Sequence, residues 1–418
     1  MSLRDHSSAI AAAKSLVLRS ALAVVGTQAA VVVGLVLVDA AKKRRRTRRK
    51  GFPHPGVFES RVARTRTTIY TCGEDLYADM LAAIREAREQ ILLETFIWKG
   101  DATGAMFKEA LTEAAHRGVD VHIVFDGFAN LVVPRRFFDF DPRIHVYRFP
   151  VLRPSLLLRN VRSTGQDHRK LLVIDQRIGY VGGYNIGSLY ATEWRDTHLR
   201  LEGPSVGDLH RAYLSVWNDR LGRPRREIPE TGADFWEPRL RPVNNIPAHL
   251  VYPIRGMYLD AISRASDHVY ITTAYFIPDQ QILGALLKAS RRGVDVRVIL
   301  PEDSNHVLAD WLSRGFYTSL LAAGVTVLLY RNAMIHAKTA TIDGQWSTVG
   351  TANIDRLSLT GNYETNMEIY DAGLAADMER IFEVDANNSR VLTEEEWNQR
   401  SLLARFSELV LVPLRPFL

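Results

Sequence analysis

Two copies of the pattern His-x-Lys-x4-Asp occur in this sequence, at residues 168–175 and 336–343. A constant, gapless offset of 168 residues relates the copies, and it also superimposes polar residues beyond the two motifs. Within both copies an acid follows the histidine after 28 residues. The matched residues are His168 with His336, Lys170 with Lys338, Asp175 with Asp343, Gly182 with Gly350, Asn185 with Asn353, and Asp196 with Glu364. One such pattern would be weak evidence, but its repetition indicates two equivalent half-sites, each with its own acid.

These residue types suit attack on a phosphodiester. One neutral histidine would attack phosphorus to form a phosphohistidine, while the other, protonated, would donate to the leaving alkoxide and later deprotonate the acceptor. Positive charge from Lys170 and Lys338, with the amides of Asn185 and Asn353, would stabilise the non-bridging oxygens. The acids Asp196 and Glu364 would fix the histidine tautomers. We therefore expect these eight side chains, with His168 and His336 at the centre, to form one site.

Other polar residues near the motifs have less certain roles. Gly183 would allow the backbone to approach the phosphate closely, although a turn explains a glycine there equally well, and Thr351 and Ser358 could donate further hydrogen bonds. Asp175 and Asp343 could act in catalysis, but an Asp followed by Gln or Gly is typical of a hairpin turn, which favours structural support. A duplicated scaffold without activity is the alternative interpretation of the whole repeat.

The segments around the motifs predict an α/β fold. Residues 83–98 and 261–278 each read as an amphipathic helix followed by an apolar strand, and residues 117–127 and 292–303 supply a second strand after another helix. This alternation predicts two similar domains, each a mixed, largely parallel sheet flanked by helices, with one active site at their pseudo-twofold interface. We expect an N-terminal anchor at 1–50, domains at 60–217 and 250–418, and a Pro- and Arg-rich linker at 218–249.

The N-terminal segment has the composition of a membrane anchor. Residues 20–38 carry no charge, and a helix of this length spans about 28 Å, close to one hydrocarbon core. Eight basic residues follow at 42–50, as in a stop-transfer signal, which predicts a single-pass helix with the catalytic domains on the cytoplasmic side of the inner membrane. A signal peptide, an interfacial helix or a helix packed on the domains are the alternatives. The apolar C-terminal tail, 406–418, could also lie at the membrane or pack as ordinary core.

The charge distribution disfavours nucleic acid as a partner. The chain carries a net charge of +6, but residues 1–50 hold eleven Lys and Arg against two Asp, so the remainder is slightly acidic. A broad basic surface for a phosphate backbone is not expected. The one cysteine, Cys72, excludes an internal disulfide, and the twelve histidines contain no HExxH pair. We expect chemistry without a metal or other cofactor, since the lysines supply the positive charge.

The paired motifs, together with GYVGGYNIG, WRDTHLRLEGP and MIHAKTATIDGQWSTVGTANID, resemble the phospholipase D superfamily, and within it the bacterial cardiolipin synthases. The resemblance covers roughly residues 60–418. It implies exchange between two phosphatidylglycerol molecules to give cardiolipin and glycerol, with His168 as nucleophile and His336 as acid and base. Thr351 replaces a more frequent serine, and the order of residues 355–359 departs from the family pattern, which leaves the acceptor open. A hydrolytic phospholipase D, a nuclease and a non-catalytic membrane adaptor are the alternatives.

Overall fold

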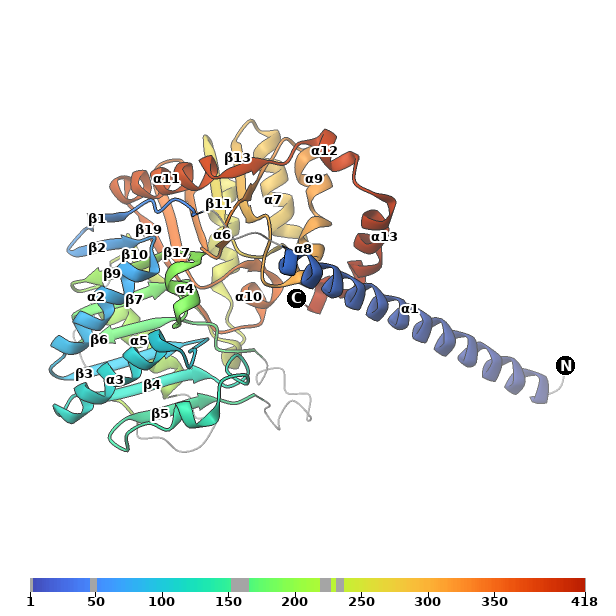
Figure 1. The fold of residues 1–418 in the computed structure, drawn as a ribbon. Coiled ribbons are helices and arrows are strands. Elements are labelled where there is room, and N and C mark those ends of the chain that lie inside the picture. The colour runs from blue at the N-terminus through green and yellow to red at the C-terminus, as the bar shows by residue number, and fades with distance from the viewer. Residues whose placement is uncertain (1–2, 46–50, 152–164, 219–226, 231–236, 418) are drawn as a thin grey trace.

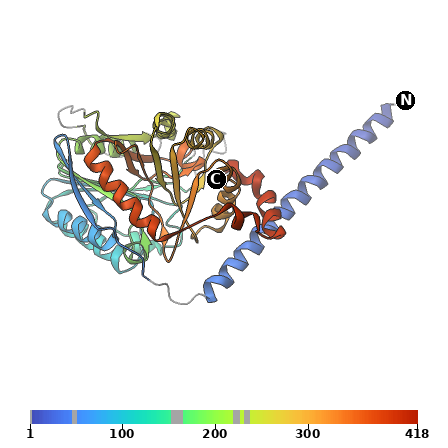
Figure 2. The same cartoon turned by 90° about the horizontal axis from the view of Figure 1, so that it is seen from above.

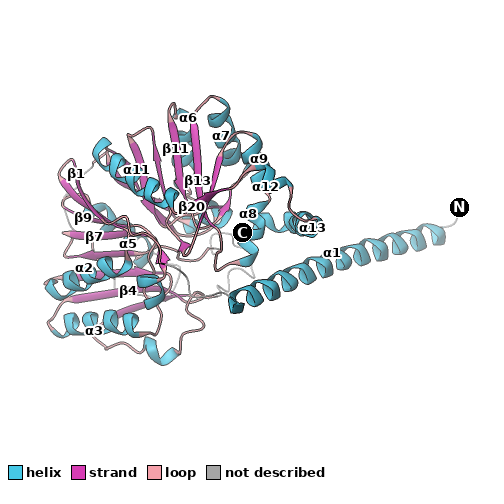
Figure 3. Cartoon of the chain, turned by 45° about the horizontal axis from the view of Figure 1, so that its top comes forward, coloured by secondary structure: helices cyan, strands magenta, loops and turns pink. Residues whose placement is uncertain are grey.

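The computed structural model describes residues 3–45, 51–151, 165–218, 227–230 and 237–417 (Figure 1). Two eight-stranded sheets, each with flanking helices, face one another, and a long N-terminal helix projects from one side (Figures 1 and 3). Both sheets are mixed, as the sequence predicts. Parallel pairing is confined to three adjacent strands in each sheet, which is less than the largely parallel sheet that we expected.

The first sheet belongs to the half that carries His168. Its strands in spatial order are β1 (Val57–Val62), β2 (Thr65–Tyr70), β9 (His198–Glu202), β7 (Ile178–Gly182), β6 (Leu171–Ile174), β3 (Gln90–Thr95), β4 (Asp120–Asp126) and β5 (His145–Phe149). Its helices are α2 (Gly73–Glu86), α3 (Ala102–His116), α4 (Ser188–Thr192) and α5 (Val206–Trp217). β3, β4 and β5 are parallel, because helices or long connections separate them along the chain.

The second sheet repeats this order from β2 to β5, lacks a counterpart of β1 among the described residues, and adds β20 (Ser389–Val391) at the opposite edge. Its strands are β10 (Leu240–Asn245), β19 (Glu364–Tyr370), β17 (Trp346–Gly350), β16 (Thr339–Ile342), β11 (His268–Thr272), β13 (Asp295–Pro301), β14 (Thr326–Tyr330) and β20 (Ser389–Val391). Its helices include α6 (Pro253–Arg264), α7 (Gln280–Arg291), α8 (Val307–Arg314), α9 (Tyr317–Ala322), α10 (Arg356–Thr360), α11 (Ala372–Asn387), α12 (Glu394–Asn398) and α13 (Leu402–Leu411). β10 lies inside the expected linker, so this part of the linker belongs to the second sheet.

Each motif leads directly into a hairpin, β6–β7 or β16–β17, whose turn begins at the motif aspartate. Asp175 and Gln176 have φ of 51° and 50°, and Asp343 and Gly344 have φ of 53° and 62°. Two successive residues with positive φ match the right-handed twist of the flanking strands, and the N–H of Arg177 or Gln345 closes the turn onto the carbonyl of Ile174 or Ile342. The turns that the sequence predicted are therefore present at the end of both motifs.

The interface between the halves is an apolar core. A single cluster of buried residues combines Val181 and Leu199 of the first half with Val349, Met367 and Ile369 of the second. At its edge, short strands join the halves, since β15 (Met334–Ile335) pairs in parallel with β8 (Trp194–Arg195). The relative position of the two motifs is fixed by this packing rather than by the connecting chain.

The N-terminal part of helix α1 (Leu3–Arg45) projects away from the domains and its later part lies along α8 and α13, and two views show α1 and α13 side by side (Figures 1 and 2). Its segment Leu22–Ala41 is long and apolar enough to cross a membrane, and none of that segment is buried. Of the basic block at 42–50, residues 46–50 lie outside the described residues.

Candidate active site

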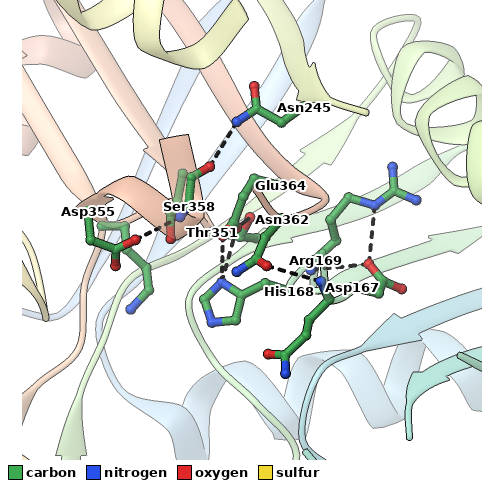
Figure 4. A network of polar contacts seen from close by, with 12 residues as sticks. Asp167, His168, Arg169, Asn245, Thr351, Asp355, Ser358, Asn362 and Glu364 are labelled. Carbon is green, nitrogen blue, oxygen red and sulfur yellow. Dashed lines mark hydrogen bonds and ion pairs between the residues drawn. The ribbon is translucent and has the colours of Figure 1, made fainter. Parts of the chain in front are cut away.

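His168 lies at the interface and is paired with an acid of the opposite half. Its Nδ1 lies 3.0 Å from both Oε1 and Oε2 of Glu364 on β19 (Figure 4). Glu364 is fully buried, and its pKa is lowered, because His168, Lys170 and Thr351 together outweigh the effect of burial. The ionised carboxylate therefore accepts the Nδ1 proton of His168. This leaves the Nε2 lone pair of His168 available to an electrophile.

The second histidine repeats this arrangement with the halves exchanged. His336 Nδ1 lies 2.6 Å from Oδ2 of Asp196, which follows β8 of the first half. The main chain obeys the same symmetry, since His168 N donates to the Tyr363 carbonyl at 3.1 Å and His336 N to the Arg195 carbonyl at 2.7 Å. We had grouped each acid with the histidine of its own half. The structure corrects this grouping, because each histidine depends on the residues of the opposite half.

Burial sets the charge state of both histidines. The pKa of His168 is lowered and that of His336 is lowered well below its usual value, by burial first and then by the nearby lysines. Lys170 and Lys338 both lower the pKa of each histidine, which places the four groups in one electrostatic neighbourhood. Two neutral imidazoles therefore face a shared cationic site.

The two lysines are buried and poised to change their charge. Burial lowers the pKa of Lys170 to about 7 and that of Lys338 to about 8, although Glu364 and Asp196 partly oppose this effect. Each ammonium group donates to the carbonyl of the histidine two residues earlier. An anionic phosphate would stabilise both ammonium groups, so the site is suited to an anion that compensates this positive charge.

Gly183 and Thr351 support the acids rather than the phosphate. The Thr351 hydroxyl donates to Glu364 Oε2 and accepts from Thr365 N at 2.9 Å, so it is engaged before any substrate arrives (Figure 4). Gly183 N donates to the Thr197 carbonyl at 3.0 Å. A Cβ atom on Gly183 would lie 2.0 Å from Oδ1 of Asp196. We expected both residues to contact the substrate, whereas the contacts observed are with the two acids and the main chain.

The two asparagines are buried at the site, but they are used differently. Asn185 Oδ1 accepts from Ile97 N at 3.0 Å, whereas Asn353 Oδ1 has no hydrogen-bond partner among the described residues. Ser358, the remaining candidate, holds Asp355: its N–H donates to Asp355 Oδ1 at 2.7 Å, and its side chain is a further hydrogen-bond partner of that carboxyl (Figure 4). Asn353 Oδ1 is therefore left as an acceptor for a ligand hydroxyl, and Ser358 positions Asp355.

Asp175 and Asp343 are occupied by main-chain N–H groups. Asp175 accepts from the N–H groups of residues 88–90, at 2.8–2.9 Å, and Asp343 accepts from those of residues 266–268 at similar distances. These contacts join each hairpin turn to the start of β3 or β11. The geometry gives both aspartates a structural function and no hydrogen bond to His168 or His336, in agreement with the turn interpretation and against a catalytic one.

Several residues at the site were not predicted. Phe96 packs edge-on against His168 with ring centroids 4.6 Å apart, and Trp194 lies 4.9 Å from the His336 ring. Arg195, next to Asp196, forms a buried bidentate pair with Asp385 of α11, at 3.0 and 2.8 Å. Burial raises the pKa of Asp355 to about 7, partly offset by Ser358 and Lys338. Of these residues, only Trp194 and Arg195 could have been noticed in the sequence, because they directly precede Asp196.

A separate group of potential metal ligands lies outside this site. Asp120 and His122 of β4 and His145 of β5 offer ligand atoms within 4.8 Å of one another, because the register of the two parallel strands pairs the histidines. Asp120 Oδ1 lies 2.9 Å from His122 Nε2 and 3.6 Å from His145 Nε2. The spacing of the histidines in the sequence did not reveal this group.

A duplicated α/β chain with histidine–carboxylate pairs exchanged between its halves defines an enzyme of the phospholipase D superfamily. The family described as "Cardiolipin synthase, PLD-like domain" matches residues 80–216 and 258–386. The chain belongs to this family, and it is a phosphatidyltransferase.

Curated relatives agree with this assignment. The chain is 34% identical over 369 residues to the major cardiolipin synthase ClsA of Bacillus subtilis, an alignment that covers 84% of this chain and 75% of the relative. It is 30% identical over 373 residues to a cardiolipin synthase of Clostridium perfringens, covering 84% and 76%. The phosphatidylserine synthase of Haemophilus influenzae shares the fold, with a TM-score of 0.64, 15% identity, and coverage of 86% of this chain and 94% of that structure.

Proposed function

We propose that this protein transfers a phosphatidyl group from one phosphatidylglycerol to a second, giving cardiolipin and glycerol. The observation that carries the proposal is the pair of buried histidines, each held through Nδ1 by an acid of the opposite half, beside two buried lysines. The relatives named cardiolipin synthase support the choice of lipid substrate. The apolar segment Leu22–Ala41 supports a membrane location.

The proposed reaction has two steps. His168 Nε2 attacks phosphorus and a nitrogen–phosphorus bond forms. The bond from phosphorus to the oxygen of the headgroup glycerol breaks as His336 donates a proton to that oxygen. His336 then takes a proton from a hydroxyl of the second phosphatidylglycerol, whose oxygen displaces His168 from phosphorus. Lys170 and Lys338 stabilise the non-bridging oxygens in both steps.

His336 must be protonated for the first step, although its pKa is depressed in the empty site. An anionic phosphodiester bound among the two lysines opposes that depression, because it favours the charged form of each nearby cation. Substrate binding therefore prepares the acid that the first step needs. The two steps as proposed use neither a metal nor a cofactor.

The location that we propose is the inner membrane, with the catalytic domains on the cytoplasmic side. The basic residues that follow Leu22–Ala41 favour retention of the C-terminal side in the cytoplasm. A protease-protection experiment on sealed inverted and right-side-out vesicles tests this orientation, since only inverted vesicles should expose the domains.

A product assay tests the reaction. Purified enzyme in mixed micelles of detergent and phosphatidylglycerol should form cardiolipin and glycerol in equal amounts. Formation of phosphatidic acid alone would identify a hydrolase. Rapid acid quenching with labelled lipid tests the nucleophile: His168→Ala should lose the protein-bound label, whereas His336→Ala can retain it. The reverse pattern would exchange the two roles.

A further inference from the structure

The C-terminal helix α13 carries most of its large apolar residues on the outside. Four large apolar side chains of one face are exposed, while the opposite side buries Ser407 and Glu408, with 4% and 8% exposure, together with Leu411. The exposed side chains are Leu402 (81%), Leu403 (73%), Phe406 (50%) and Leu409 (70%). A surface helix of a soluble domain normally turns its apolar face inward. This reversed orientation is suited to an environment less polar than water.

Ion pairs to the buried Glu408 fix the orientation of α13. Glu408 accepts from Arg314 of α8 at 3.2 Å and from Arg400 at 3.0 Å, and Arg400 also lies over the Trp397 ring at 4.1 Å. Rotating α13 to bury its leucines would separate Glu408 from both arginines and leave their charges unpaired near the core, which is unfavourable. The apolar face is therefore held outward by its own packing.

The position of α13 along α1 gives its depth relative to the apolar segment. Gln28 Nε2 of α1 donates to the Val410 carbonyl of α13 at 3.2 Å, and the two helices lie side by side in both views (Figures 1 and 2). Gln28 is about 9 Å from Leu22 and about 20 Å from Ala41 at the rise of an α-helix. If Leu22–Ala41 occupies the hydrocarbon layer, α13 lies at the same level.

The chain after α13 returns toward the active site. The 3-10 helix η5 (Val412–Phe417) contacts α10, the short helix that carries Ser358 and follows Asp355. Arg415 of η5 lies over the Phe316 ring at 4.4 Å, which anchors this segment to the second domain. The segment η5 therefore links α13 to the helix beside Asp355, so the position of α13 can affect the site.

We propose that α13 inserts into the phospholipid bilayer beside α1, with Leu402, Leu403, Phe406 and Leu409 among the acyl chains. This inference rests on the proposed membrane location. It adds a second embedded element to the anchor. The occupant is the bilayer rather than a second copy, because the apolar face continues along α1, whose exposed side chains in this region are also apolar, among them Val25, Val33 and Val36.

Depth-dependent quenching in the full chain tests the inference. In a Cys72→Ser background, a single cysteine at Leu403 or Leu409 carries an environment-sensitive fluorophore, and the protein is reconstituted in vesicles of phosphatidylethanolamine and phosphatidylglycerol. Both labels should shift to shorter wavelength and lose emission when lipids with spin-labelled acyl chains are included. A label at Val33 of α1 is the positive control, and one at the exposed Glu86 of α2 is the negative control.

The outcomes separate this inference from the membrane location itself. Quenching at Val33 without quenching on α13 would refute the insertion of α13 and leave α1 in the membrane. Quenching at neither position would refute both. A blue shift on α13 that lipid spin labels do not quench, accompanied by energy transfer between copies, would assign the face to a second copy of the chain and also refute the inference.

A second variant measures the consequence for turnover. Leu403→Asp should lower the rate on vesicles while leaving the rate on dispersed short-chain phosphatidylglycerol unchanged, because only the first assay needs contact with a bilayer. Val391→Asp on β20, an equally apolar and 54% exposed position away from α13, is the matched control and should affect neither assay. Equal losses of Leu403→Asp in both assays would contradict an interfacial role.

Discussion

Exchange of acids between the halves predicts which catalytic step each acid supports. Glu364 belongs to the second half, but its carboxylate holds His168 of the first, with both oxygens 3.0 Å from Nδ1. We therefore expect Glu364→Gln to slow formation of the covalent intermediate, the step assigned to His168. By the same argument, Asp196→Asn should slow both proton transfers of His336, so that the intermediate forms more slowly and, once formed, also decays more slowly.

The magnitude follows from the contacts that are lost. A hydrogen bond to a charged group contributes about 1.5–3 kcal/mol, and each 1.36 kcal/mol corresponds to a factor of ten in rate. The hydrogen bond alone thus accounts for a loss of about 10- to 150-fold in Glu364→Gln. Glutamine can also donate to Nδ1, which would place the proton on Nε2 and remove the nucleophilic lone pair, so the loss should reach at least the upper end of this range.

Rapid-quench kinetics with labelled phosphatidylglycerol resolves the two steps. Glu368→Gln is the matched control, since Glu368 is a buried acid on the same strand, paired with Arg241 rather than with a catalytic histidine. Circular dichroism and thermal unfolding establish that each variant is folded. If Glu364→Gln formed the intermediate at the normal rate and Asp196→Asn did not slow its decay, the assignment of acids to histidines derived from this structure would be wrong.

Three further predictions concern the charge of Lys170, the space beside Gly183 and the hydrogen bonds that Asp175 accepts. Burial lowers the pKa of Lys170 to about 7, so its ammonium group loses a proton as the pH rises. KM should therefore increase above pH 7 by up to about tenfold per pH unit, and by less in Lys170→Arg. A KM that does not change with pH would contradict the role of this charge. Gly183→Ala should lower kcat about 100-fold or more by displacing Asp196, whereas Gly256→Ala, with open space around its Cβ, should be active; equal activity of both would refute the steric argument. Asp175→Ala should lower the free energy of unfolding by about 2–3 kcal/mol in denaturant titrations with kcat per folded molecule unchanged, and a lower kcat at full stability would instead make it catalytic.

The sequence predicted the local elements well, because a strand or a turn depends mainly on nearby residues. Apolar runs identified the central strands, and the motif aspartates marked the hairpin turns. β10 was missed since its residues read as linker: it contains Arg241 and Pro242, and proline is tolerated there only because β10 is an edge strand. Pairing with β19 determines its structure, and no local pattern reports that pairing.

The partners of the catalytic histidines could not be predicted from spacing. A distance of 28 residues from His168 to Asp196 holds equally for an acid that serves its own histidine and for one exchanged across a twofold interface. The choice depends on the packing of the two sheets, through residues such as Val349 and Met367 that show no polar signal. The contact between the Thr351 hydroxyl and Glu364 lies within the second half, where β17 pairs with β19, and the spacing did not reveal it either.

Differences at equivalent positions give the two half-sites distinct environments. The offset that pairs Asp196 with Glu364 also pairs Gly183 with Thr351. In the first half the acid is shorter and packs where a side chain on Gly183 would stand; in the second, the longer acid is held by the threonine hydroxyl. Each acid thus matches its supporting residue. Because one oxygen of Asp196 approaches His336 while Glu364 presents two to His168, the two histidines are not interchangeable, as a reaction with one nucleophile and one acid requires.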